Sequence, residues 1–221
     1  MTAVGSVFSK IIKKKWKRIL RARFSPIIVW GSGAFGPLRH STSLLDIAGV
    51  RGHLTADALG LPEIAAIGDP GLLINRFDAK PFKDARYKFG IIPHVSDRQL
   101  PAVAEMLKTP SSLFIDLGDP DLLGTIRKIR SCDYIASSSL HGLVAADAFG
   151  IPAVWVRLSN NLHGGNWKFH DYFSMVGRAP KEPIVLAGSP DMALLEKEME
   201  TADKALIEKC RVALVERFKS I

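Results

Sequence analysis

Short apolar runs alternate with helical patterns along most of this 221-residue chain, and no other feature constrains its fold as strongly. Ile27–Trp30 and Ala153–Val156 contain only apolar residues, as strands do when they are buried on both faces of a parallel sheet. Further strands of this kind are predicted over 46–50, 64–67, 89–92, 113–115 and 134–136. Helices are predicted over 54–59, 97–107, 119–129, 140–149 and 190–218. Strands that alternate with helices form βαβ units, so the sequence predicts an α/β fold with parallel sheets.

The length allows one large α/β domain or two smaller ones. The least regular stretch, Arg76–Arg86, is rich in charged residues and contains little that could be buried. Such a composition is typical of an interdomain linker. The predicted organisation is a basic amphipathic helix over 1–24, a partial N-terminal lobe over 25–80, and a C-terminal lobe over 87–221 that ends in a long helix.

The net charge of +8 is concentrated at one end of the chain. Residues 1–23 hold eight Lys and Arg residues and no acid, whereas the rest of the chain has 22 basic and 22 acidic residues. This distribution argues against nucleic-acid binding, which usually needs a basic groove spread over the fold, and indicates a local contact with an anionic partner. Apolar side chains recur at close to helical spacing within residues 8–23. Two interpretations are open: a helix on an anionic membrane surface, or a solvated helix that covers the domain edge.

The two cysteines, Cys132 and Cys210, lie far apart and belong to no C-x-x-C pair or Cys/His cluster. The sequence therefore predicts neither a disulfide framework nor a zinc site, and it fits a reducing cytoplasm. No stretch approaches the length of a membrane-spanning helix, and no apolar signal core follows the first positive charge. We expect a cytoplasmic protein that is soluble or peripheral.

The run Ser137–Pro152 is the stretch that most clearly indicates a site. It follows a predicted strand directly, so its serines form a turn in which Ser138 or Ser139 can cap the next helix. His141 and Gly142 then fall in the first turn of that helix, where free N–H groups and the helix dipole favour a phosphate or carboxylate. The alternative is an ordinary strand–turn–helix whose histidine finds a hydrogen-bond partner. Spacing alone leaves both interpretations open.

This run resembles the signature of the polysaccharide pyruvyl transferase family, in which Ser-Leu-His-Gly or Arg-Leu-His-Gly opens a small-residue helix that ends in Gly-Ile-Pro. Four other stretches resemble family motifs in the same order: Val50–Thr55, Gly68–Leu72, Ile91–His94 and Lys168–Phe173. The likeness extends from about Trp30 to Phe173. It implies two Rossmann-like lobes with parallel sheets in a GT-B-like fold, with the N-terminal lobe incomplete in this chain.

The resemblance also implies a reaction. Members of the family transfer pyruvate from phosphoenolpyruvate to a sugar of an exopolysaccharide repeat unit and form a pyruvate ketal. Such a site needs cations and N–H donors for a carboxylate and a phosphate, together with a general acid and a base, and it requires no metal or organic cofactor. The implied partners are phosphoenolpyruvate and a glycan acceptor. A lipid-linked acceptor would place the enzyme at the inner face of the plasma membrane, held there by residues 8–23.

The resemblance implies catalytic roles for His141 and Lys168. The residues predicted to bind substrate are Ser138, Ser139, Leu140, Gly142, Arg51, His94, Gly31 and Gly33. Three alternatives are open. Arg51 could brace the turn at Asp69 through a salt bridge. His94 and Asp97, which follow another predicted strand, could face the same cleft, or His94 could be a half-buried histidine beside a helix cap made by Ser96 or Asp97. Lys168 could be an exposed lysine.

Two departures from the family pattern leave other functions open. Many members carry Arg at the position of Ser139, and the N-terminal half of the family is usually longer. The first alternative is therefore a truncated, non-catalytic relative that binds an anionic ligand. The second is a glycosyltransferase of GT-B type, which would need a nucleotide-sugar site. The sequence offers no acidic residue in a convincing ribose-binding context.

Overall fold

The computed structural model describes residues 26–34, 36, 45–62, 65, 67–77, 86–160, 165–186 and 190–221. The chain forms two compact units. Unit 1 takes its described residues from Met1–Pro70, His163–Pro180 and Asp203–Ile221, and unit 2 takes them from Gly71–Leu162 and Lys181–Ala202. The predicted basic helix over 1–24 lies outside the described residues.

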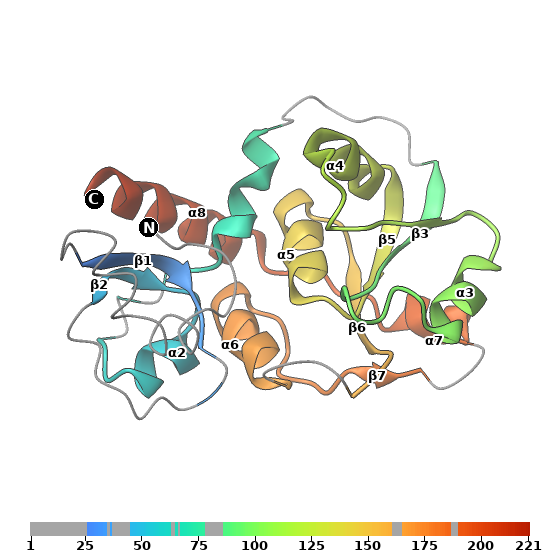
Figure 1. Ribbon diagram of the computed structural model, residues 1–221, viewed down its shortest axis with the longest axis horizontal. Coiled ribbons are helices and arrows are strands. Elements are labelled where there is room, and N and C mark those ends of the chain that lie inside the picture. Colours follow the sequence, from blue (N-terminus) through green and yellow to red (C-terminus); the bar gives the residue numbers. More distant parts are fainter. Residues whose placement is uncertain are drawn as a thin grey trace. The chain divides into compact units, whose positions relative to one another are not determined.

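Unit 2 contains a five-stranded sheet in which every strand pair is parallel (Figure 1). The strand order is β4-β3-β5-β6-β7. Its strands are β3 (Tyr87–Ile92), β4 (Ser112–Phe114), β5 (Cys132–Ser137), β6 (Ala153–Arg157) and β7 (Ile184–Val185). Its helices are α3 (Pro101–Leu107), α4 (Leu122–Arg130), α5 (Leu140–Phe149) and α7 (Met192–Lys197). The prediction of an α/β fold with parallel sheets is confirmed.

Helices cover both faces of this sheet, as its apolar strands require. Phe89 of β3 packs with Met106 of α3 and Leu195 of α7 in one buried cluster. Ile92 lies three positions further along β3, so its side chain points to the opposite face of the sheet. There it lies close to Gly142 of α5. Side chains on a strand point to opposite faces in turn, so α3 and α7 cover one face and α5 the other.

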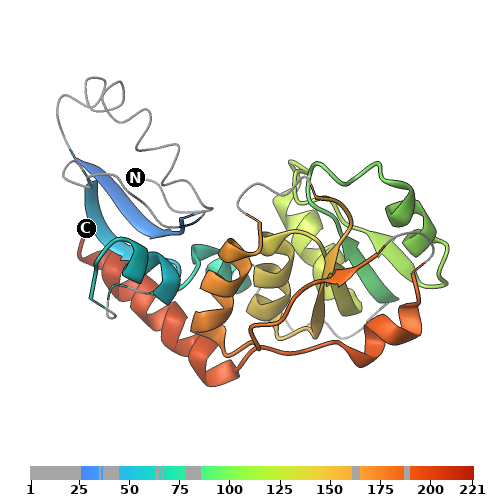
Figure 2. The same ribbon diagram turned by 90° about the horizontal axis from the view of Figure 1, so that it is seen from below.

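Unit 1 contains a second parallel sheet of two strands. Its elements are β1 (Ile27–Ser32), β2 (Leu45–Val50), α2 (His53–Ala58), α6 (Trp167–Val176) and α8 (Lys204–Lys219). Figure 2 shows α8, the longest helix of the described chain, beside the two strands. The Nε1 of Trp30 in β1 donates to the carbonyl of Leu214 in α8 at 2.9 Å, and its ring lies 5.2 Å from that of Phe218. A 3-10 helix, η2 (Pro70–Arg76), begins where the chain leaves unit 1.

The helix predicted over 190–218 is wrong as a single element, because the chain breaks into α7 and α8. Between them Glu200 forms an antiparallel bridge with Ala153 of β6, which a continuous helix could not make. Asp203 then begins α8 by accepting hydrogen bonds from the N–H groups of Ala205 and Leu206. This break returns the chain to unit 1.

Other predicted boundaries shift for local reasons. Helix α3 begins at Pro101 rather than 97, since proline lacks an N–H and suits the first helical position. Neither α6 nor β7 was predicted from the sequence. Of the strand predicted over 64–67, residues 64 and 66 lie outside the described residues and Ile67 is not in a strand. Of the predicted linker, 78–85 lie outside them too. None of the described helices is long and apolar enough to cross a membrane.

Candidate functional site

The strand order creates a switch point in unit 2. The chain runs from β3 outward to β4 and then returns to the other side of β3 with β5. In open parallel sheets, ligands bind outside the carboxyl ends of the strands at such a point. His94 follows β3, Ser138 to Gly142 follow β5, and Ile92 pairs with Ser137 at the strand ends (Figure 1). The structure therefore brings six of the ten predicted site residues to one edge of one sheet.

Two of the three consecutive serines at the end of β5, Ser137 and Ser138, have hydroxyls that are hydrogen-bonded within the fold. The Ser137 hydroxyl accepts from the Ser139 N–H at 3.0 Å and lies 2.7 Å from the Ile92 carbonyl, to which it donates. The Ser138 hydroxyl accepts from the His94 N–H and donates to Asp97 Oδ2, both at 2.9 Å. The Ser138 side chain therefore holds the turn after β5 to the loop after β3 at the predicted site.

Ser139 is placed differently, because it is the N-cap residue of α5 yet its hydroxyl makes no capping hydrogen bond. Its extended backbone (φ −100°, ψ 132°) starts the helix. The first N–H groups of a helix have no partners within the helix, and the dipole adds a partial positive charge. An uncapped start with a serine hydroxyl beside it is a suitable cradle for an anion.

The other predicted residues of this turn shape the cradle. His141 is half-buried in the first turn of α5, and Leu140 is buried beside it. Gly142 allows close packing, because a Cβ there would lie 2.9 Å from Cγ2 of Ile92 and would collide with the Ser137 hydroxyl. Of these residues, only His141 offers a side chain that can move a proton.

Asp97 was expected to face the cleft with His94, but it was not among the residues predicted to bind substrate. Its carboxylate is fully buried and accepts hydrogen bonds from the hydroxyls of Ser138, Ser159 and Ser96 at 2.9, 2.7 and 3.0 Å. Neither Ser96 nor Asp97 caps a helix, as one alternative supposed, because α3 begins four residues later with Leu100 as its N-cap. The Ser96 hydroxyl instead lies 2.8 Å from Nδ1 of the half-buried His94.

In unit 1, Arg51 is fully buried and paired with Asp171 of α6. Arg51 Nε donates to Asp171 Oδ2 at 2.9 Å, and Nη2 lies 2.8 Å from the same oxygen. The alternative that Arg51 braces the turn at Asp69 stays a prediction, and the pair with Asp171 was not predicted from the sequence. Gly33 makes room for this pair, because a Cβ at Gly33 would collide with the Arg51 guanidinium.

Asp171 also caps helix α2. Its Oδ1 accepts from the Thr55 N–H at 2.8 Å, and its Oδ2 accepts from the Thr55 hydroxyl at 2.7 Å. Gly52 lets α6 approach, since a Cβ there would collide with the Asp171 carbonyl. Gly31, at φ +69°, packs against Pro70 in the same unit. The space beside both predicted ligand-binding glycines, Gly31 and Gly33, is therefore occupied by the chain itself.

Lys168 lies in α6, three residues before Asp171. It is 8% exposed, so the alternative of an exposed lysine is wrong, and its Nζ lies 5.4 Å from the centre of the Phe169 ring. Lys168 belongs to unit 1 and His141 to unit 2. The predicted site residues are thus divided between the units, and the catalytic function of Lys168 stays a prediction.

Neither cysteine is suited to nucleophilic chemistry. Burial raises the pKa of the Cys132 thiol to about 12 and that of Cys210 to about 11. Both thiols therefore stay protonated near neutral pH, and the thiolate is the reactive form. Within the described residues no group of three or more His, Cys, Asp or Glu side chains is placed to hold a metal ion.

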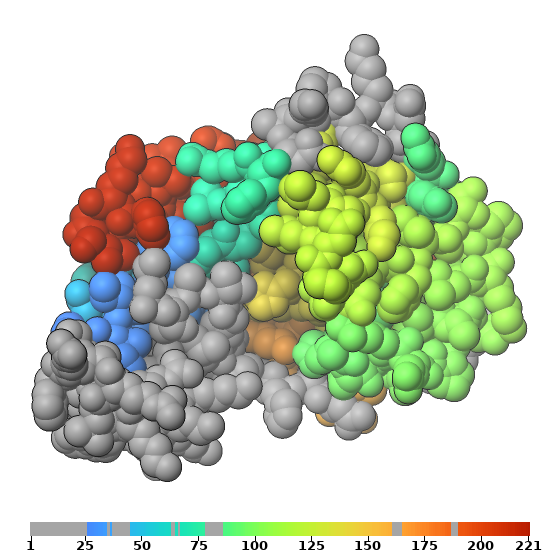
Figure 3. Space-filling model, turned by 45° about the horizontal axis from the view of Figure 1, so that its top comes forward, coloured from blue at the N-terminus to red at the C-terminus, as the bar shows by residue number. Residues whose placement is uncertain are grey.

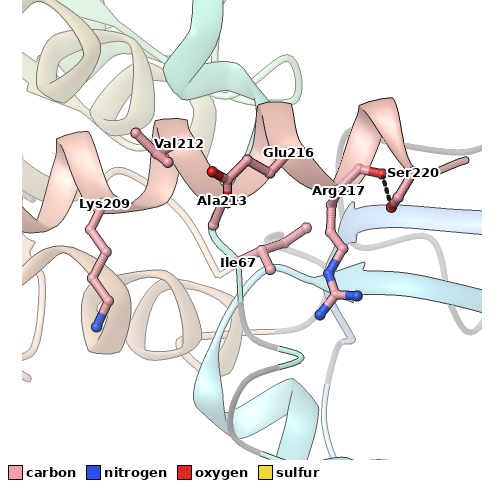
Figure 4. A pocket seen from close by; sticks show the side chains of 7 residues that line it. All are labelled: Ile67, Lys209, Val212, Ala213, Glu216, Arg217 and Ser220. Atoms are coloured by element: carbon pink, nitrogen blue, oxygen red, sulfur yellow. Dashed lines mark hydrogen bonds between the residues drawn. The ribbon is translucent and has the colours of Figure 1, made fainter.

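A groove of about 640 Å³ lies along α8 in unit 1. The outward side of α8, red in Figure 3, is at the surface, and Figure 4 shows the groove's side chains. They are Ile67, Lys209, Val212, Ala213, Glu216, Arg217 and Ser220. Three of them are aliphatic, three are charged and one is a serine, and none is a predicted site residue.

Comparison with known proteins identifies the family of the chain. The family model for polysaccharide pyruvyl transferase matches residues 14–160, which is more than half of the chain and includes the Ser-Leu-His-Gly turn. The chain belongs to the polysaccharide pyruvyl transferase family. This pyruvyl transferase family member is 34% identical over 160 residues to uncharacterized protein L143 of Acanthamoeba polyphaga mimivirus, a match that covers 68% of the chain. It is 30% identical over 139 residues to the succinoglycan biosynthesis protein ExoV of Rhizobium meliloti (strain 1021), covering 60% of the chain. The matches cover 55% of the viral protein and 41% of ExoV, so the chain spans about half the length of these relatives.

Proposed function

We propose that this protein transfers pyruvate from phosphoenolpyruvate to a sugar of an exopolysaccharide repeat unit and forms a pyruvate ketal. The observation that carries the proposal is the uncapped start of α5, where Ser139 and His141 meet the switch point of a parallel sheet. Family membership supports the reaction class, and the similarity to ExoV, a succinoglycan biosynthesis protein, supports a glycan acceptor.

In this proposal the donor phosphate lies at the start of α5. The first N–H groups of the helix and the Ser139 hydroxyl donate to its oxygens, and the helix dipole offsets part of its charge. His141 stands in the same turn as a proton carrier. The proposal thus brings the proton carrier and the donor phosphate together in the first turn of one helix.

The reaction itself needs one proton delivered and two C–O bonds formed. A proton added to the methylene carbon of phosphoenolpyruvate turns that carbon into a methyl group and leaves an oxocarbenium-like centre at C2. One sugar hydroxyl adds to this centre and loses its proton. A second hydroxyl then replaces the phosphate, which leaves as inorganic phosphate. Hydrogen bonds that hold the phosphate stabilise the charge that develops as it departs.

The acceptor belongs to the same proposal. We propose that it is a glycan carried on a lipid at the inner face of the plasma membrane and that the basic segment over 8–23 binds the anionic lipid there. A variant with the basic residues of this segment reversed to Glu should lose binding to anionic vesicles. Retained binding would contradict this part of the proposal without touching the donor site.

The first experiment is thermal unfolding of the chain with increasing phosphoenolpyruvate. A ligand that binds only the folded state raises Tm by mass action. The native chain should show this rise, and His141→Ala should lose it while its ligand-free Tm stays unchanged. His53→Ala is the matched control, since His53 is the first residue of α2, a helix start that Asp171 already caps.

Three outcomes would redirect the proposal. A Tm rise with nucleotide sugars and none with phosphoenolpyruvate would favour a glycosyltransferase. An equal rise with inorganic phosphate, and no phosphate release when acceptor glycans are added, would favour a non-catalytic anion-binding relative. No rise in a folded native chain would contradict donor binding altogether.

A further inference from the structure

Asp97 joins the loops that follow three neighbouring strands of unit 2. Its carboxylate lies after β3 and accepts from Ser138 after β5 and from Ser159 after β6, 62 residues further along the chain. These loops end at the carboxyl edge of the sheet, where the start of α5 also lies. One buried carboxylate therefore connects the elements on both sides of the switch point.

The Asp97 carboxylate accepts its side-chain hydrogen bonds from hydroxyl groups. Oδ1 accepts from Ser96 and Ser159, and Oδ2 accepts from Ser138. The carboxylate is 0% exposed, and no basic side chain of the described residues pairs with it. Burial of a carboxylate without a counter-ion is unfavourable, so this group is a poor choice for stability alone. A function in arranging the loops accounts for its presence.

A chain of hydrogen bonds leads from Asp97 to the start of α5. The Ser138 hydroxyl gives its proton to Asp97 and accepts from the His94 N–H, so both capacities of this hydroxyl are used. The Asp97 N–H closes the same turn by donating to the His94 carbonyl at 2.8 Å. Ser138 is thereby held on two sides. The next residue is Ser139, the N-cap of the helix, so its backbone position follows from that of Ser138.

We propose that Asp97 is the positioning residue of the donor site: by holding the loops after β3, β5 and β6 together, it fixes the start of α5 in the geometry that binds phosphoenolpyruvate. The inference rests on the proposed function, because it takes phosphoenolpyruvate as the ligand of that helix start. Asp97 acts through Ser138 and Ser159 and does not itself touch the donor.

The test compares two serines of unit 2 that each donate one hydrogen bond. Ser159→Ala removes a bond to Asp97 at the carboxyl edge of the sheet. Ser131→Ala removes a bond of 2.8 Å to the Lys128 carbonyl, just before the amino end of β5. Both variants should lower the ligand-free Tm to a similar extent. Only Ser159→Ala should raise the Kd for phosphoenolpyruvate, by about fivefold, the effect of one hydrogen bond, with Asp97→Ala raising it about tenfold or more.

Asp97→Asn separates positioning from folding, since an amide keeps the shape of the carboxylate and should remain folded. Its affinity should fall between those of the native chain and Asp97→Ala. Native affinity in Ser159→Ala and Asp97→Asn would overturn the proposal, and so would an equal loss in Ser131→Ala, which would indicate general destabilisation.

A second readout keeps the inference separate from the proposed function. If the native chain does not bind phosphoenolpyruvate, the proposed function fails, and amide hydrogen exchange then tests the positioning alone. The His94 N–H, which donates to Ser138, should exchange faster in Asp97→Asn than in the native chain. An unchanged rate would show that Asp97 does not hold the turn.

Discussion

Asp171 in unit 1 and Asp97 in unit 2 are both fully buried carboxylates, and their hydrogen bonds come from different kinds of donor. Asp171 in unit 1 accepts from the guanidinium of Arg51 and from Thr55, which lie 120 and 116 residues away. Among the residues that the structure describes, Asp97 in unit 2 accepts from three serine hydroxyls, one of them on the adjacent residue. The rigid, charged guanidinium of Arg51 holds together segments of unit 1 that are distant in sequence. The serine hydroxyls around Asp97 instead position the loops of a sheet that strand pairing already holds together. Burial of a carboxylate therefore does not by itself distinguish a stabilising group from a positioning one.

The largest expected effect comes from breaking the charged pair. Asp171→Ala removes a carboxylate that pairs with the buried Arg51 guanidinium, and it removes the cap of α2. We expect the free energy of unfolding to fall by about 3–5 kcal/mol, as when one partner of a buried ion pair is removed. Urea unfolding measures this loss, and the double variant Arg51→Met with Asp171→Leu should recover much of it. A loss below about 1 kcal/mol would show that the pair does not secure unit 1.

The two cysteines report on the units separately. Cys210 in α8 contacts the Met175 carbonyl of α6 at 3.8 Å, and Cys132 begins β5 in unit 2. Both thiols are buried, and burial raises their pKa values to about 11 and about 12, so a thiol reagent at pH 8 reaches them only when the structure opens. Asp171→Ala should accelerate modification of Cys210 and leave Cys132 slow. If the modification of both cysteines were accelerated equally, Asp171→Ala would destabilise both units and not unit 1 alone.

A smaller loss is expected from Asp97→Asn. The amide replaces an anionic acceptor of hydroxyl protons with a weaker one, and no cation loses its partner. We expect about 1–2 kcal/mol less unfolding free energy, in the range of hydrogen bonds to a charged group. The same urea titration measures it. A loss as large as that of Asp171→Ala would remove the distinction between the two carboxylates.

The smallest effect on stability is expected from Ser139→Ala. Loss of an N-cap serine usually costs about 1 kcal/mol because the hydroxyl accepts from the helix. Ser139 makes no such bond, so its replacement should change the unfolding free energy by less than about 0.5 kcal/mol. Thermal unfolding measures the change, and phosphoenolpyruvate binding should weaken in the same variant. A destabilisation above about 1 kcal/mol would mean that the hydroxyl caps α5 in solution.

Local sequence patterns predicted the elements that local forces decide. Helix α5 was predicted with its observed bounds, because Ser139 and Gly150 mark its ends and small apolar residues fill it. The break between α7 and α8 escaped prediction. Its cause is the bridge between Glu200 and Ala153, a contact between residues far apart in the chain.

The same limit applies to the site. The Ser-Leu-His-Gly turn was found because its chemistry lies within a few consecutive residues. The sequence suggested Asp69, an acid close in sequence, as a possible salt-bridge partner of Arg51, but it offered no sign of the pair with Asp171 in α6. The hydrogen-bond partners of Asp97 have no local signature either, because they depend on the order in which β3, β5 and β6 lie in the sheet. Charges and hydroxyls that meet across the fold need the topology before they can be paired.

Unit 1 draws on three separate stretches of the chain, and this has a consequence for its synthesis. The ribosome releases β1 and β2 first, but Asp171 and α8 follow only after most of unit 2 has emerged. Domains generally fold in the order in which they are made, and here the order is reversed. Unit 2 is complete once Ala202 has left the ribosome, while the first two strands wait for the last helix. In a nascent chain arrested after Ala202, unit 2 should therefore be folded and Cys132 protected from thiol reagents. Unit 1, which contains Arg51, should still lack α8.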